Sequence, residues 1–211
     1  MAQDLSHLVL NSPEMAKSRQ LPRILMILAV VLLGGVFLFP LWQINLDAAQ
    51  FPGGLDLNIW IDRFSGAEGD DNIIQNVNIL NHYIGMQYIE PDSIPEHKYF
   101  SIIAYIMMGL GLLAAVINKK WGYATWFIIM GILSILAVYD FYLWLYDYGH
   151  NLDPKAPIKL EGMTYMPPLF GEKDLLNFYV KSYPHWGTIL MTLSIVFSFF
   201  AFLKSPKKLR R

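Results

Sequence analysis

The sequence contains no cysteine and few charged residues. Without thiols the chain has no disulfide, no thiolate nucleophile, no iron–sulfur ligand and no Cys-based zinc site. Charged residues make up 16% of the 211 residues, whereas soluble domains carry about 25%. The hydrophobic fraction is 55% and the mean hydropathy is +0.35. This composition predicts an integral membrane protein, in which any metal would be held by His, Met, carboxylate or backbone ligands.

Four apolar segments are long enough to cross a bilayer as helices. We expect these helices at residues 24–42, 99–117, 121–146 and 183–203. The first segment could instead be a signal peptide, but its long polar leader, its length and the lack of a small-x-small cleavage site favour a retained helix. The predicted fold class is therefore a mostly α membrane protein, a four-helix transmembrane bundle in which Gly109 and Gly111 allow close helix packing.

Positive charge sets the orientation of these predicted helices. Ten of the sixteen Lys and Arg residues lie in three short pieces, within residues 1–23, 118–120 and 204–211. With four spans, all three pieces fall on one side of the membrane, which the positive-inside rule makes the cytoplasm. We therefore expect a multi-pass protein of the bacterial inner membrane, with both termini cytoplasmic and with segments 43–98 and 147–182 outside.

The first exterior segment is predicted to form a small α+β domain between spans one and two. Apolar and polar residues alternate over 43–48 and 55–62, which predicts two strands joined by a turn at Phe51–Gly54. A helix with one apolar stripe should follow from Asn72 and end at Gly85.

The second exterior segment has little periodicity and several prolines. We expect an extended cover over the hairpin and helix, with a further helix over Glu172–Lys181. Pro184 would then occupy the first turn of span four, where a proline fits a helix.

Acidic residues are concentrated in segment 43–98, which holds nine of them against Arg63 and Lys98. These acids could simply solvate an outer domain, or their negative potential could attract a cation or a basic partner surface. The sequence shows no phosphate-cradling loop, serine triad, zinc-protease motif or nucleic-acid module, and the basic tail fits topology and anionic lipid. The expected partners are the lipid bilayer and a protein at the periplasmic face, without nucleic acid.

Imidazole and thioether side chains of the exterior segments suggest a copper site. The candidate ligands are His82, Met86, His97, Met163 and Met166. Nitrogen and soft sulfur ligands suit Cu(I) when thiolates are absent. The alternative is that His82, which faces away from the apolar stripe of its helix, is a solvated residue and that the methionines only pack between loops.

Asp140 is a second candidate site residue, because it lies about one turn inside the outer boundary of the third span. His185, at the start of the fourth span, could pair with Asp140 or with Asp147. The alternative is a structural role, in which Asp140 reaches the interface and bonds Tyr or His side chains.

Several motifs resemble a known family. They are Phe39–Trp42, Ala49–Leu55, Asn78–Met86 with the core LNHYIGM, and Glu90–Glu96. These motifs resemble small four-span bacterial inner-membrane proteins associated with the accessory genes of nitrous oxide reductase, a periplasmic copper enzyme of denitrification. The resemblance implies a role in the maturation, copper supply or electron supply of that enzyme, and it favours His82 and Met86 as copper ligands.

Three functional hypotheses follow. The leading one is a non-enzymatic accessory protein of the inner membrane that handles copper or supports the maturation of a periplasmic copper enzyme. The alternative is a structural subunit or docking platform of a membrane complex, with no metal site of its own. The third is a membrane enzyme or transporter that uses Asp140 and His185.

Overall fold

A computed structural model describes residues 13–67, 72–91, 96–158, 164–175 and 178–205. The chain divides into two compact units, each built from segments far apart in the sequence. The first unit comprises residues 1–35, 103–133 and 190–211, and the second comprises residues 36–102 and 134–189.

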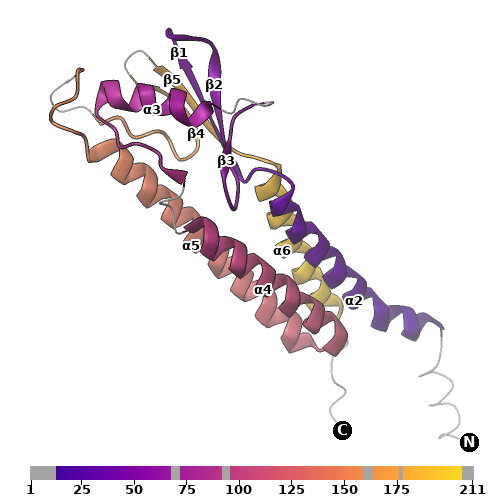
Figure 1. The fold of residues 1–211 in the computed structure, drawn as a ribbon. Helices are drawn as coiled ribbons and strands as arrows, with labels where there is room; N and C mark the ends of the chain where they lie inside the picture. Colours follow the sequence, from indigo (N-terminus) through magenta and orange to yellow (C-terminus); the bar gives the residue numbers. More distant parts are fainter. Residues whose placement is uncertain (1–12, 68–71, 92–95, 159–163, 176–177, 206–211) are drawn as a thin grey trace, which may run out of the picture. The chain divides into compact units, whose positions relative to one another are not determined.

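Among the described residues, four helices are long and apolar enough to cross a membrane (Figure 1). They are α2 (Pro13–Gly34), α4 (Glu96–Ile117), α5 (Lys120–His150) and α6 (Trp186–Lys204). The first ends earlier than the sequence suggested, because Gly34 is followed by the short 3₁₀ helix η1 (Gly35–Phe37) and by Pro40. The third extends to His150, beyond the expected end at residue 146.

Within the first unit, small and hydroxyl-bearing residues bring helices together. The Ser194 hydroxyl donates to the Ala29 carbonyl at 2.6 Å, and the Trp126 indole donates to the Met107 carbonyl at 2.8 Å. A side chain on Gly111 would meet Val30 of α2 at 2.4 Å, so this glycine is required for close approach. Gly109 has nothing within 4 Å of its Cβ position and carries no such constraint.

The second unit contains a five-stranded antiparallel sheet with the order β3-β2-β1-β5-β4. Its strands are β1 (Trp42–Ala48), β2 (Phe51–Ile59), β3 (Phe64–Ser65), β4 (Gly171–Leu175) and β5 (Phe178–Pro184). The alternating sequence predicted the pairing of β1 with β2, but the turn between them lies at Ala49 and Gln50. Phe51–Gly54 instead belongs to β2. The register of the β1–β2 pairing shifts at this point, since Leu46 pairs with Leu55 whereas Ala48 pairs with Phe51.

The predicted helix over Glu172–Lys181 is wrong, because the described residues of this range lie in the antiparallel strands β4 and β5, which pair with each other. In β5 the buried Phe178, Val180 and Ser182 alternate with more exposed residues, which is the period of a strand. Pro184 ends β5, and α6 begins two residues later at Trp186. Because β5 pairs with β1, the sheet is larger than the predicted two-stranded hairpin.

Helix α3 (Ile73–Ile84) lies against one face of the sheet (Figure 1). Its predicted apolar stripe is confirmed, since Ile73, Val77, Leu80 and Ile84 are all buried. Gly85 ends the helix in the left-handed conformation with φ +79°, which a residue with a Cβ rarely adopts. The core between α3 and the sheet also receives side chains from the end of α5 and from the segment around Tyr165.

Candidate functional site

His82 lies on the exposed side of α3, as the helical periodicity predicted. Its Nδ1 atom is 3.1 Å from the Tyr88 hydroxyl, and the two rings stack with centroids 6.3 Å apart. The imidazole therefore already has a hydrogen-bonding partner on the surface of the second unit.

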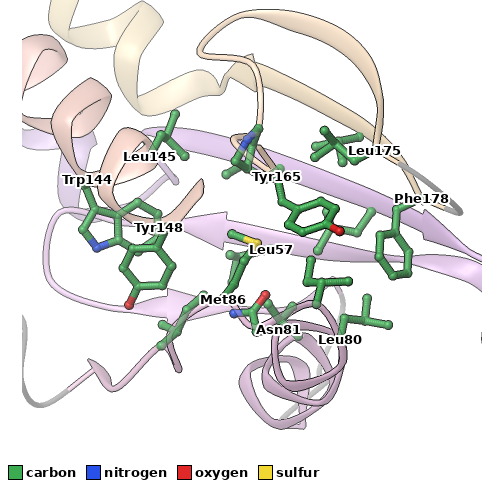
Figure 2. Close-up of a pocket in the computed structure, with 17 residues that line it drawn as sticks. Leu57, Leu80, Asn81, Met86, Trp144, Leu145, Tyr148, Tyr165, Leu175 and Phe178 are labelled. Atoms are coloured by element: carbon green, nitrogen blue, oxygen red, sulfur yellow. The ribbon is translucent and has the colours of Figure 1, made fainter. Parts of the chain in front are cut away.

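Met86 follows the chain reversal at Gly85 and packs against the apolar core. Its side chain lines a cavity of the second unit, and its sulfur lies among apolar side chains in Figure 2. His82 and Met86 are only four residues apart, yet one side chain is exposed and the other lines an apolar cavity.

The remaining copper candidates are placed on other segments. His97 is half-buried in the first turn of α4, where its ring meets the Phe64 ring edge-on at 4.9 Å. Met166 packs against the core, and its carbonyl accepts a hydrogen bond from the Lys173 ammonium at 3.1 Å. Met163 lies outside the described residues. In the part of the chain that the structure describes, no group of three or more His, Asp or Glu residues could hold a metal ion.

Asp140 and His185, the second candidate pair, are both half-buried. Among the described residues no hydrogen bond or ion pair joins them, and the Nδ1 atom of His185 is buried without a partner. The backbone of His185 has a structural role at the start of α6, because its carbonyl accepts hydrogen bonds from Thr188 and Ile189. No described contact supports the predicted pairing of His185 with Asp140 or with Asp147.

A different set of residues forms a continuous polar surface on the sheet. We call it the polar sheet face; it is the face opposite to the one that carries the buried strand residues. It comprises Gln43, Asn45, Asp47, Asp56, Asn58, Glu172, Asp174, Tyr179, Lys181 and Tyr183. All of these side chains are half-buried or exposed.

The strand register aligns this face in rows, since side chains of paired residues point to the same side of a sheet. One row contains Asp56, Asn45, Lys181 and Glu172, taken from four adjacent strands. In this row the Asn45 amide donates to the Asp56 carboxylate at 2.6 Å. The next row brings together Asp47, Tyr179 and Asp174.

Charge on the polar sheet face is predominantly negative. It carries four carboxylates, from Asp47, Asp56, Glu172 and Asp174, against the single ammonium group of Lys181. That ammonium lies 4.0 Å from the Asp47 carboxylate, with both side chains partly exposed, so the ion pair is weak. The face therefore presents a net negative charge to its surroundings.

Two tyrosines fix one of these carboxylates. The hydroxyls of Tyr179 and Tyr183 both donate to Glu172, the second at 3.2 Å. The hydrogen bond from Tyr179 lowers the pKa of the Glu172 carboxyl, because it stabilises the charged form. The same bond raises the pKa of Tyr179 to about 12, because the neutral phenol is the donor. Glu172 is thus held ionised and in a defined orientation.

Sequence reasoning found only part of this surface. It identified the excess of acids in residues 43–98, which includes Asp47 and Asp56, but it assigned Glu172–Lys181 to a helix and so missed the half contributed by β4 and β5. The alternation of buried and exposed residues over Phe178–Ser182 is the signal that could have revealed β5.

Comparisons with known proteins do not add a family. No family model matches the chain, and a search of the curated proteins found no significant match. The resemblance to proteins associated with nitrous oxide reductase therefore stays a prediction from the motifs alone.

Proposed function

We propose that this chain is a membrane-anchored docking protein without a metal site of its own. Its four apolar helices would anchor it in a bacterial inner membrane with both termini in the cytoplasm, as the three basic pieces of the sequence suggest. The second unit would then face the periplasm and bind a protein partner that has a basic surface.

The observation that carries this proposal is the in-register polar sheet face. Its four carboxylates come from three strands, β1, β2 and β4, that are held in register by the sheet, so their spacing is rigid. A preorganised negative surface that also carries the half-buried Tyr179 and the exposed Tyr183 complements a positive patch on a partner and increases the rate of encounter. The placement of the copper candidates supports docking over metal handling, because His82 is exposed while Met86 lines the apolar cavity.

Site-specific photo-crosslinking in native membranes tests the proposed surface. A photoreactive residue replaces Gln43 on the polar sheet face or, as a matched control, Gln75 on the exposed side of α3. We expect a discrete crosslinked product from position 43 and none from position 75. Crosslinking from position 75 alone would show that the partner binds elsewhere.

Charge variants of equal magnitude test the electrostatic basis of binding to the partner identified by that crosslink. Asp47→Asn with Asp174→Asn removes two charges from the polar sheet face, whereas Asp62→Asn with Glu90→Gln removes two exposed charges from other parts of the same unit. At about 0.2–1 kcal/mol per exposed pair, the first variant should bind about 2- to 30-fold more weakly, and the control should bind normally. High salt should weaken binding of the parent protein, because it screens exposed charges. Equal effects of both variants would contradict the proposal.

A further inference from the structure

The second unit contains a cavity between the sheet and α3, partly open to the surface, with a volume of about 60 Å³. Seventeen residues line it, and Figure 2 shows them converging from the sheet, from α3, from the end of α5 and from the segment around Tyr165. Most are aliphatic, such as Ile44, Leu57, Leu80 and Val180. The cavity therefore offers a predominantly apolar environment.

Tyr165 introduces a single unpaired polar group into this environment. The residue is only 2% exposed, and its hydroxyl is buried without a hydrogen-bond partner. Figure 2 shows this hydroxyl pointing into the cavity, toward Phe178. Because the Tyr165 amide donates to the Gly149 carbonyl at 3.1 Å, the backbone that carries the phenol is tied to the end of α5.

Two other polar side chains around the cavity have partners. The Tyr148 hydroxyl donates to the Tyr88 carbonyl at 3.0 Å, and the Asn81 amide donates to the Gln87 carbonyl at 3.0 Å. Among the described residues that line the cavity, Tyr165 is thus the one with a buried side-chain atom that lacks a partner. Buried donors are normally satisfied, so this hydroxyl indicates a missing acceptor.

We propose that the cavity binds a small apolar molecule with one hydrogen-bond acceptor, such as the carbonyl group of a short ketone or aldehyde. The Tyr165 hydroxyl donates to that acceptor, and the hydrocarbon part of the molecule contacts the aliphatic lining. A single water molecule fits this site less well, because buried waters usually have two to four polar partners. This site is separate from the polar sheet face, and the proposal does not depend on the docking function.

The size of the cavity restricts the ligand to a few non-hydrogen atoms. A cavity of about 150 Å³ lined by similar residues holds a benzene molecule, so about 60 Å³ holds less. Met86 can enlarge the space, since its unbranched thioether side chain is flexible and lies in the cavity. Its methyl group is also a reporter at the site of binding.

Titration of the full chain with propanone, the smallest ketone, tests the proposal. The protein is prepared in detergent with ¹³C-labelled methionine methyl groups, and the Met86 resonance is assigned from its loss in Met86→Leu. The matched probe is 2-methylpropene, in which a methylidene group replaces the carbonyl oxygen. We expect a saturable shift of the Met86 resonance with propanone, and no shift of the resonance of Met107, which is buried in the first unit.

Tyr165→Phe distinguishes recognition by the hydroxyl from simple filling of an apolar space. Propanone should bind this variant about 2- to 10-fold more weakly, as expected for the loss of one hydrogen bond, while binding of 2-methylpropene should not change. A cooperative thermal transition at or above that of the parent will show that the variant is folded. The absence of a saturable shift with propanone would overturn the proposal, and so would unchanged propanone binding by Tyr165→Phe or an equal loss of binding for both probes. Detection of an ordered water on Tyr165 that persists at saturating propanone would overturn it as well.

Discussion

Replacement of Tyr165 by Phe should not destabilise the ligand-free protein, although it changes a residue that is 98% buried. The substitution keeps the aromatic ring and removes only a hydroxyl that has no hydrogen-bond partner. A buried unsatisfied polar group costs about 1–3 kcal/mol, so its removal should leave the free energy of unfolding unchanged or raise it by up to that amount.

Tyr148→Phe is the matched comparison. Tyr148 lines the same cavity and is 9% exposed, but its hydroxyl donates to the Tyr88 carbonyl at 3.0 Å. Loss of this hydrogen bond should lower the free energy of unfolding by about 0.5–1.5 kcal/mol.

Thermal unfolding in detergent, followed by near-ultraviolet circular dichroism, measures the difference. For a chain of this length a change of 1 kcal/mol shifts Tm by about 2–4 °C. Tyr165→Phe should therefore melt at or above the parent temperature, and Tyr148→Phe should melt below it. If Tyr165→Phe lowers Tm as much as Tyr148→Phe does, the hydroxyl of Tyr165 has a partner in the ligand-free protein and the reasoning is refuted.

Three further predictions follow from other contacts. In Glu172→Gln the pKa of Tyr179 should fall from about 12 toward its ordinary value of 10.0, and an alkaline titration would show this as phenolate absorbance at lower pH. In the parent protein the Tyr179–Glu172 hydrogen bond contributes its full stabilisation of the folded state between pH 4.5 and 10.0. This contribution is lost as the pH falls through the lowered pKa of Glu172, and also as the pH rises through about 12. Gly85→Ala should lower the free energy of unfolding, measured by chemical denaturation, by about 1–3 kcal/mol, because φ is +79° and the new Cβ would lie 2.8 Å from the Cβ of Ala156. Gly109→Ala is the control: this residue has open space around its Cβ position and lies within helix α4, so the substitution should not lower the free energy of unfolding. The copper hypothesis predicts that His82→Ala with Met86→Ala lowers the Cu(I) stoichiometry of the purified protein, and an unchanged titration would reject these two ligands.

The helices were predictable because their signals are local and strong. Each apolar run is itself long enough to cross a bilayer, and the stripe of α3 recurs at the helical period over one continuous segment. Gly85 likewise marks the end of α3 from its own conformational preference. The helix boundaries were less accurate, since the first and last turns depend on neighbouring segments.

The sheet was only partly predictable because its central pairing is not local. β1 lies between β2, which follows it directly, and β5, whose Ser182 accepts a hydrogen bond from Trp42 across 140 positions of sequence. In β4 three consecutive charged residues, from Glu172 to Asp174, conceal the strand period. Local periodicity could therefore identify the hairpin of β1 and β2, but it could not identify β5, which pairs with β1, or β4, which pairs with β5.

The candidate sites were less predictable than the fold. The cavity combines Met86 and Tyr165, which lie on different segments and carry no recognisable motif. Spacing also grouped His82 with Met86, whereas the reversal at Gly85 separates their environments. Chemistry inferred from a short motif fails where the backbone turns sharply between its members.

The position of β1 in the middle of the sheet affects how the protein can be made. Until residues 178–184 leave the ribosome, β1 has a neighbour on one edge only, and the backbone groups of its other edge are unpaired. Because β1 and β5 are so distant in sequence, we expect their pairing to be slow and to occur near the end of synthesis. Truncation before β5 should leave a nascent chain with an open strand edge, which is prone to pair with other chains.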